Sequence, residues 1–461
     1  MAKKKTARPA TPTTSDKKVN FYLVALPLVA FLVKLIIASN IIPIVQFGGH
    51  IQSGGWLGAD GENYLNGVAG LINNGLFSHE HLLSYWPAGY PLLIWALTKI
   101  SIAHTLWLIS IVQSAFYGFA SYFFVKQLRD TRLKPYLFMI GFILAANPTL
   151  SLSSLAVGYE SPIAAAMLMV AGLILKAEKN PTDGKFWKRV VAVGGFFALA
   201  SFMQPRWLLT TIVVAVVWAL AHSTRKVQAL IVAVVVGVMA IAPIALVARN
   251  IKADQGAVIS TNLGVTMRIG AGESTTGGYK HTGPDVPCDP TPPATTVSDN
   301  QIVKCVVKWY VTHPVSAVKL FFFKGFYFWS PWSGPNANGT MARNPWLKIN
   351  PVMNVATGSH QGNSFTFGIF GKAFSILWVY GGVALFFIGF FWLRSFGGVY
   401  STLALVSGLP VILSWLVSMG TIGDHRFRLP TMALSLFLQV IGYYGLKKKL
   451  TTRSFSVTAQ G

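Results

Sequence analysis

The 461-residue chain is apolar and strongly basic, with 53% hydrophobic residues, only 11% charged residues and a formal net charge of +24. Soluble domains carry roughly 25% charged residues, so the composition excludes an ordinary soluble protein. Apolar runs near the ~20 residues that a helix needs to cross a bilayer recur along the chain. The basic residues fall in short loops between these runs, which indicates a polytopic membrane protein and argues against nucleic-acid binding.

In chain order, residues 1–20 are basic and contain Thr and Pro, and we predict a disordered cytoplasmic tail. No small-residue cleavage site follows the first apolar run, so we predict a retained helix and not a signal peptide. A membrane domain over 21–446 and a cytoplasmic tail over 447–461 follow. We predict an all-α fold with about ten transmembrane helices, in a range of roughly nine to thirteen. The predicted spans are 21–39, 104–125, 136–157, 163–177, 189–203, 207–222, 227–248, 373–393, 399–420 and 429–446.

Basic clusters follow alternate predicted spans and fall on the same side as the N-terminal lysines, which predicts that this side is cytoplasmic. Two large loops, 40–103 and 249–372, then lie outside. The apolar segment 88–100 is too short for a span, and we predict an interfacial or re-entrant helix in the first of these loops. The sequence therefore predicts a plasma (inner) membrane protein whose functional site lies on the extracytoplasmic side.

The second outer loop contains the only two cysteines, Cys288 and Cys305. Their placement outside the cell is compatible with a disulfide but does not establish one. The aromatic-rich stretch from Trp309 to Trp332, which includes Lys324, predicts an amphipathic helix at the outer interface.

Asp60 and Glu62 are the most informative pair, because the chain has only 14 acidic residues and these two follow the first span closely. An acidic pair near a membrane face can bind a metal or accept a proton from a reacting hydroxyl. The surrounding Ala-Asp-Gly-Glu-Asn sequence also suits a solvated turn. On these residues alone, both interpretations stay open.

Other polar groups cluster at the predicted outer ends of spans. Glu160 precedes Ser-Pro, so it fits either a helix start or an acidic group that orients an acceptor hydroxyl or pairs with Arg206. His425, Arg426 and Arg428 form an outer turn. Arginines on this side oppose the positive-inside bias. Their guanidinium groups suit a lipid phosphate. The simpler alternative is that they extend to the outer headgroups or pair with acidic residues.

Taken in order, these segments resemble the bacterial GT-C membrane glycosyltransferases, a superfamily that includes protein O-mannosyltransferases and aminoarabinose transferases. The resemblance covers positions 20–446 and depends on the order of several weak motifs. These are Asp60 with Tyr64, Trp86-Pro87-Ala88-Gly89-Tyr90-Pro91, Glu160, Gln204-Pro205-Arg206, Arg249-Asn250, Ser260 to Gly264, Ile269-Gly270, Gly277-Gly278 and His425 to Pro430.

The resemblance implies a polyprenyl-phosphate sugar donor, presented outside the membrane, and a glycan, lipid or protein acceptor. It implies that Asp60 is catalytic, as general base or metal ligand, in a single inverting displacement. Glu160 matches a second acidic position, where many relatives carry Asp. Substrate-binding residues are then expected to be Tyr64, Arg206, His425, Arg426 and Arg428.

A divalent cation, Mg²⁺ or Mn²⁺, would bind at Asp60 and Glu62, although two carboxylates alone do not establish a metal site. The alternatives are a flippase or transporter for lipid-linked sugars, a membrane polymerase of lipid-linked oligosaccharides, and a non-enzymatic scaffold. A transporter predicts charges at mid-membrane depth and broken helices. Polar residues here gather at the ends of spans, apart from Lys34, which favours an enzyme at the interface.

Overall fold

The computed structural model describes residues 14–41, 43, 45–57, 60–275, 277–278, 286–288, 298–329, 373 and 376–458, with the backbone alone for 14–19, 148 and 451–458. Most of the predicted N-terminal tail, residues 330–372 of the second outer loop and Trp332 lie outside the described residues. The first helix, α1 (Thr14–Ser39), begins within the predicted tail, and the last, α19 (Leu429–Thr458), continues into the predicted C-terminal tail.

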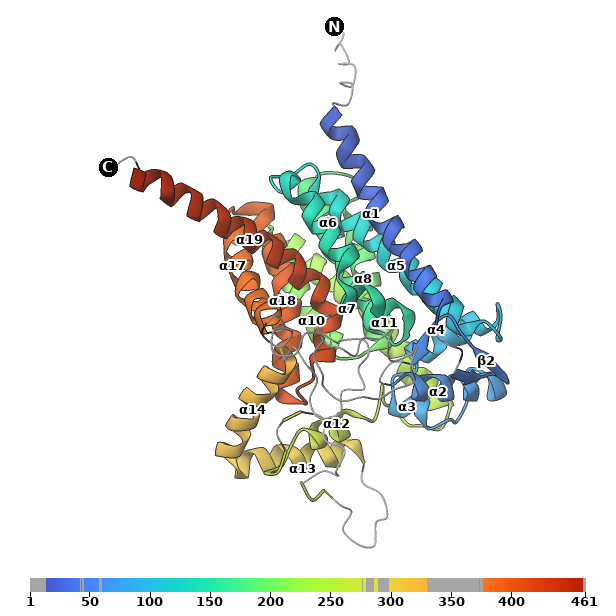
Figure 1. Cartoon of the computed structure of the whole chain (residues 1–461). Helices are drawn as coiled ribbons and strands as arrows, with labels where there is room; N and C mark the ends of the chain where they lie inside the picture. Colours follow the sequence, from blue (N-terminus) through green and yellow to red (C-terminus); the bar gives the residue numbers. More distant parts are fainter. Residues whose placement is uncertain are drawn as a thin grey trace.

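The long helices form an all-α bundle, and both chain ends lie at one end of it (Figure 1). Within the described residues, eight helices are long and apolar enough to cross a membrane. They correspond to eight of the predicted spans. Besides α1 and α19, the long helices are α5 (Thr105–Leu128), α8 (Glu160–Lys179), α9 (Phe186–Met203), α11 (Arg225–Lys252), α17 (Gly382–Arg394) with the π-helical turn η3 (Leu377–Gly381), and α18 (Gly398–Gly420).

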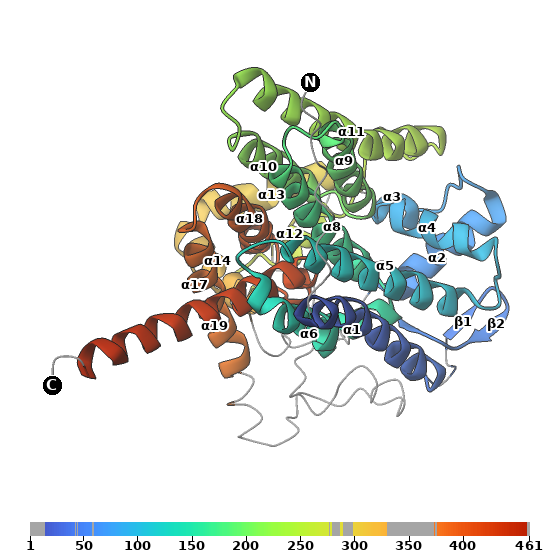
Figure 2. The same cartoon turned by 90° about the horizontal axis from the view of Figure 1, so that it is seen from above.

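Helix α8 lies at the centre of the bundle, as the view from above shows (Figure 2). Nearly all of its side chains are buried. Its small residues, including the Ala164-Ala165-Ala166 run, allow neighbouring helices to approach closely, as is typical of packing between membrane helices. The first residue of α8, Glu160, therefore belongs to the most buried of the long helices.

Helices α17 and α19 cross closely through a pair of glycines. A Cβ atom at Gly389 would overlap the carbonyl oxygen of Leu438, and one at Gly442 would overlap that of Leu385. Only glycine permits this approach of two backbones. The crossing anchors α19, whose beginning carries the 425–428 turn.

The predicted span 136–157 is not one helix. The 3₁₀ turn η1 (Lys134–Tyr136) leads into α6 (Leu137–Ala146), and the chain then bends by 51° before α7 (Pro148–Leu152) and the 3₁₀ turn η2 (Ser153–Leu155). The break lies at Asn147-Pro148, because a residue before proline disfavours the helical conformation. Asn147 is extended, with ψ 114°, and its side chain accepts a hydrogen bond from the Leu150 amide at 3.0 Å.

Two shorter apolar helices accompany the long ones. The predicted span 207–222 is α10 (Trp207–Ala219), whose 13 residues cover only about 20 Å at 1.5 Å per residue. The predicted interfacial segment is α4 (Gly89–Thr98), which has 10 residues. Both are shorter than the ~30 Å hydrocarbon core of a bilayer.

The end of the bundle opposite the termini carries the remaining elements (Figure 1). Antiparallel β1 and β2 form a hairpin, and parallel β3 and β4 pair across a long stretch of sequence. Cys288 and Cys305 form a disulfide in the second predicted outer loop. The elements here are β1 (Val45–Phe47), β2 (His50–Gln52), β3 (Trp56–Leu57), α2 (Gly61–Asn74), α3 (Leu82–Tyr85), β4 (Ala156–Val157), α12 (Leu263–Ile269), α13 (Asp299–Thr312), α14 (Pro314–Trp329) and the 3₁₀ turn η4 (His425–Arg428).

Candidate active site

Two acidic residues that are 100 positions apart in sequence meet because β3 and β4 pair. Leu57 lies opposite Val157 in the parallel register of the two strands. Asp60 and Glu160 each come three residues after these partners. Asp60 is the N-cap of α2, and Glu160 is the first residue of α8. The strand pair thus places two carboxyl groups at two adjacent helix starts, where the helix dipoles favour negative charge.

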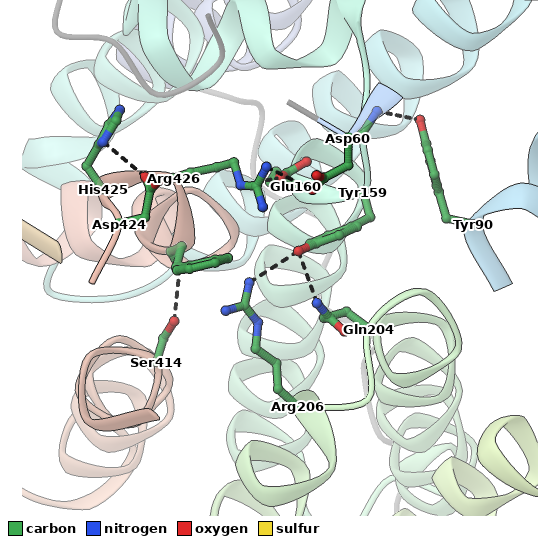
Figure 3. A network of polar contacts seen from close by, with 12 residues as sticks. Asp60, Tyr90, Tyr159, Glu160, Gln204, Arg206, Ser414, Asp424, His425 and Arg426 are labelled. Atoms are coloured by element: carbon green, nitrogen blue, oxygen red, sulfur yellow. Dashed lines mark hydrogen bonds and ion pairs between the residues drawn. The ribbon is translucent and has the colours of Figure 1, made fainter. Parts of the chain in front are cut away.

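Arg426 joins these two carboxyl groups (Figure 3). Its Nη1 lies 2.8 Å from Oδ2 of Asp60, and its Nε lies 3.6 Å from Oε1 of Glu160. All three side chains are largely buried, with exposed fractions of 12% for Arg426, 17% for Asp60 and 3% for Glu160. Buried like charges repel each other unless a countercharge lies close by. Arg426 supplies that countercharge.

The aromatic ring of Phe427 lies beside two cations. The Arg206 guanidinium is 4.4 Å from the ring centroid, and that of Arg426 is 5.2 Å from it. Arg206 also donates a hydrogen bond to the Tyr159 hydroxyl at 3.4 Å, and Gln204 donates to the same oxygen at 3.0 Å. Cation–π contacts of this kind hold guanidinium groups in place without neutralising them. Arg206, predicted to bind substrate, therefore lies at the edge of the acidic cluster.

Asp424 shapes the turn that carries Arg426. Its side chain accepts a hydrogen bond from the Arg426 amide at 2.8 Å, and Nδ1 of His425 lies 3.1 Å from its Oδ1. Burial alone would raise the pKa of Asp424, but His425 and Arg426 lower it to about 2. His425 is buried and extends from Asp424 away from Asp60 (Figure 3). In this arrangement His425 supports the turn and does not reach the carboxyl pair.

Aromatic side chains form a wall beside Asp60. The Tyr64 ring makes edge contacts with three neighbours, at centroid distances of 6.0 Å to Trp86, 5.2 Å to Tyr90 and 6.2 Å to Tyr159. Burial raises the pKa of Tyr64 well above its usual value, with Asp60 adding to the shift. Among the described residues, the buried Tyr64 hydroxyl has no hydrogen-bond partner. That hydroxyl is a polar group that a substrate can use.

Tyr90 has a role that the sequence did not indicate. Its hydroxyl oxygen accepts hydrogen bonds from the Gly158 amide at 2.8 Å and from Gln113 at 3.1 Å, and Gln113 also donates to the Ala156 carbonyl. Tyr90 therefore holds the turn before Glu160. Gly89 is required beside it, since a Cβ atom there would overlap the backbone of Phe202. The Pro-Ala-Gly-Tyr-Pro motif, predicted as an interfacial helix start, thus also orders the site.

Two predicted site residues lie elsewhere. Glu62 is exposed on α2, although it is only two positions from Asp60. Arg428 is buried and donates to the Phe328 carbonyl at 3.3 Å. Within the described part of the chain, no ion pair joins Arg428 to Asp60 or Glu160. Glu62 is two positions from Asp60, and Arg428 is two positions from Arg426, so both were expected near the cluster. The helical backbone at each position directs the side chain away from it.

The cluster offers few free oxygen ligands for a divalent cation. Mg²⁺ requires octahedral oxygen coordination. Asp60 and Glu160 offer carboxyl oxygens, but Arg426 already pairs with both, and Glu62 does not converge on them. No group of three or more His, Cys, Asp or Glu side chains that could hold a metal occurs among the described residues. The protein groups described at this cluster therefore do not by themselves fit a resident Mg²⁺ or Mn²⁺ ion.

Comparison with known proteins identifies the fold. No family model and no curated protein matches the sequence. The chain is similar to the crystal structure of an oligosaccharyltransferase from Archaeoglobus fulgidus in its apo form. The TM-score is 0.51 at 12% identity, over 96% of this chain and 52% of that one. The same enzyme tethered to an acceptor peptide with an NVT sequon gives a TM-score of 0.50 at 12% identity, over 94% and 50%.

This chain has a GT-C-like fold. It spans about half the length of the archaeal oligosaccharyltransferase that it resembles. The likeness confirms the prediction of an all-α, polytopic membrane protein with a GT-C-like arrangement. At 12% identity it concerns the fold alone, and the chemistry has to be argued from the site.

Proposed function

We propose that this protein is a membrane glycosyltransferase that moves a sugar from a polyprenyl-phosphate carrier to an acceptor. One observation carries the proposal: the Asp60–Arg426–Glu160 cluster, assembled from three distant segments at one end of a GT-C-like bundle. Buried charged groups gathered at the end of a membrane bundle are costly and mark functional sites by default. The transporter alternative is less well supported, since this cluster lies at helix ends and not at mid-depth.

The charge pattern and the disulfide support an extracytoplasmic site. Asp60 is the N-cap of α2, and α2 lies at the end of the bundle opposite the chain termini (Figure 1). The Cys288–Cys305 disulfide belongs to the second large loop of that same end. Disulfides persist in oxidising compartments, and basic loops stay cytoplasmic. Together these features favour a plasma membrane protein whose cluster faces outward.

The proposed reaction is a single displacement at the anomeric carbon. The acceptor hydroxyl gives its proton to the Asp60 carboxylate, and its oxygen forms a bond to the anomeric carbon from the face opposite the phosphate. The bond from that carbon to the phosphate oxygen breaks, and polyprenyl phosphate leaves with the electron pair. Configuration inverts. Asp60 thereby acts as general base, a role for which a positioned carboxylate suffices.

Each neighbouring group has a defined task in this scheme. Arg426, with Arg206 beside Phe427, stabilises negative charge as it develops on the leaving phosphate. Glu160 shares Arg426 with Asp60 and orients the acceptor. The hydroxyl and ring of Tyr64 contact the sugar. No step is assigned to a metal ion, because Arg426 already pairs with both carboxyl groups.

The class of acceptor is inferred from the chemistry of the proposed base. The archaeal oligosaccharyltransferase has been crystallised with an acceptor peptide tethered to it by a disulfide bond. For this chain, we propose a hydroxyl acceptor on a glycan, lipid or protein, because a carboxylate base matches the deprotonation of an alcohol during attack. Membership of the mannosyltransferase or aminoarabinose-transferase type stays a prediction.

The test is a transfer assay with the purified protein in lipid. Polyprenyl-phosphate sugars are supplied with glycan, lipid and peptide acceptors, and products are identified by mass spectrometry. We expect a sugar-sized mass increase on one acceptor class, with inverted anomeric configuration by NMR, and activity that survives treatment with chelator. Absence of transfer from every polyprenyl-phosphate sugar would contradict the proposed function. If transfer occurs without chelator but is lost when chelator is added, the metal-independent mechanism is contradicted. The proposed transferase function then still stands.

A further inference from the structure

Lys324 on α14 is a buried cation without an acidic partner. It is 1% exposed, and its Nζ donates a hydrogen bond to the Tyr310 hydroxyl at 2.7 Å. Among the described residues, no carboxylate lies within ion-pair distance of it. Burial lowers the pKa of Lys324 to about 7. A buried ammonium group is costly unless an anion compensates it, so this position calls for a negatively charged partner.

Three glycines pack closely around Lys324, two against its side chain and one against its backbone. A Cβ at Gly277 would lie 3.0 Å from its Cγ, and one at Gly270 would lie 3.2 Å from its Cε. A Cβ at Gly423 would lie 2.6 Å from its Cα. Gly277 has φ +88°, a conformation that favours glycine, and its carbonyl accepts the Gly423 amide at 2.9 Å. The Gly277-Gly278 motif has no role in the proposed reaction. It packs closely against this lysine instead.

Lys324 is also connected to the candidate active site. Gly423, which packs against its backbone, lies three residues before Arg426. Arg426 is already paired with Asp60 and Glu160, and Arg428 points toward Phe328. Lys324 is thus a further cation at the turn that carries the cluster, and it is not committed to a carboxylate described in the structure.

A cavity of about 500 Å³ opens beside Lys324. Apart from Lys324 and the Tyr310 hydroxyl, its walls are almost entirely apolar. The lining consists of Tyr310, Ala317, Val318, Phe321, Phe322, Lys324, Met419 and Gly420. A cavity with one cation and apolar walls complements a molecule with an anionic head and a hydrocarbon chain.

We propose that Lys324 binds the phosphate of the polyprenyl carrier, and that the first isoprenoid units lie against Phe321, Phe322 and Met419. This inference rests on the proposed function and adds a specific donor-binding residue to it. The phosphate supplies the anion that the buried ammonium lacks, and its negative charge favours the protonated form of Lys324. Inorganic phosphate has no hydrocarbon chain to fill the cavity. Polyprenol has no anionic head group to pair with Lys324.

The test measures lipid binding without chemistry. The full-length protein in nanodiscs of phosphatidylcholine is titrated with polyprenyl phosphate, polyprenol or inorganic phosphate. A charge-assisted hydrogen bond predicts that polyprenyl phosphate binds roughly tenfold to a hundredfold more tightly than polyprenol. We expect Lys324→Met to abolish this difference. Lys319→Met, at an exposed position of the same helix, is the matched control and should keep it.

Each outcome decides the matter. Equal binding of polyprenyl phosphate and polyprenol by the wild type would overturn the inference, and this comparison needs no variant. So would an Lys324→Met protein that discriminates the two lipids as the wild type does. If transfer is active and the donor KM of Lys324→Met is unchanged, the inference fails while the proposed function stands. Lys324-dependent binding without transfer from any donor would contradict the proposed function alone.

Discussion

At the scale of single residues, Arg426 determines whether Asp60 and Glu160 can stay charged side by side. Both carboxyl groups are largely buried, and Arg426 contacts both, at 2.8 Å and 3.6 Å. A buried ion pair adds little net stability against an apolar replacement, but removing one partner leaves an uncompensated charge. The arginine is therefore needed structurally before any substrate binds.

We expect Arg426→Gln to lower the free energy of unfolding by ~3–5 kcal/mol, the usual cost of breaking a buried pair. The double variant Arg426→Gln with Glu160→Gln should recover part of that loss, because one buried negative charge is removed along with the positive one. Thermal unfolding of the purified proteins measures both. Strictly additive losses in the double variant would show that the two side chains do not interact.

Lys324 predicts a dependence of stability on pH. Its pKa is about 7 in the folded protein and 10.5 as a free side chain. At a pH between these two values, Lys324 is therefore more fully protonated in the unfolded chain than in the folded protein. The free energy of unfolding of the ligand-free protein should then rise as pH increases from about 7 toward 10. Below about pH 7 the full cost of burying the charge is present.

The measurement compares the wild type with Lys324→Met in unfolding experiments from pH 6 to 9.5. The excess stability of Lys324→Met should shrink steadily as the pH rises. Tyr310, the hydrogen-bond partner, has its pKa raised to about 12, and Asp424 beside Gly423 has one of about 2, so neither titrates in this range. A constant difference between the two proteins would contradict a buried, titrating Lys324.

At the scale of elements, the β3–β4 pair and Tyr90 align the starts of α2 and α8. Tyr90→Phe removes the acceptor for the Gly158 amide and for Gln113. We expect a loss of about 1–3 kcal/mol in the free energy of unfolding, since buried donors are left unpaired. We also expect a lower kcat with a nearly unchanged donor KM, because Glu160, which orients the acceptor in the proposed reaction, loses its position.

Tyr117→Phe is the matched control for that prediction. Tyr117 is equally buried, and its hydroxyl donates to the Leu144 carbonyl at 2.8 Å, away from the acidic cluster. Tyr117→Phe should lower the free energy of unfolding about as much as Tyr90→Phe but leave kcat unchanged. Equal losses of kcat in both variants would mean that Tyr90 acts only through general stability.

The elements also show where sequence reasoning reaches its limit. The length of the apolar runs predicted the long spans, because a bilayer imposes nearly the same requirement on each of them. The break at Asn147-Pro148 was open to prediction from the proline rule, but the apolar run concealed it. From the sequence, Glu62 was the expected partner of Asp60 because the two are only two positions apart. In the structure Asp60 forms an ion pair with Arg426, which is 366 positions away and is brought close only by the folded bundle.

At the scale of the whole molecule, the arrangement predicts on which side of the membrane each loop lies. Neither described cysteine is free, so an introduced cysteine reports its own position. Asn66→Cys, exposed on α2, should react with a membrane-impermeant maleimide in intact cells. Asp130→Cys, exposed in a basic loop at the opposite end, should react only after the membrane is permeabilised. The reverse pattern would place the acidic cluster in the cytoplasm.

The central claim is that Asp60 takes the acceptor proton in transfer from a polyprenyl-phosphate sugar. The most direct measurement compares kcat for wild type, Asp60→Asn and Glu62→Gln in the same transfer assay. Loss of a general base predicts a roughly 10²–10⁴-fold lower kcat for Asp60→Asn. Glu62→Gln should stay near the wild-type rate, because Glu62 is exposed outside the cluster. Wild-type transfer by a well-folded Asp60→Asn protein would contradict the account.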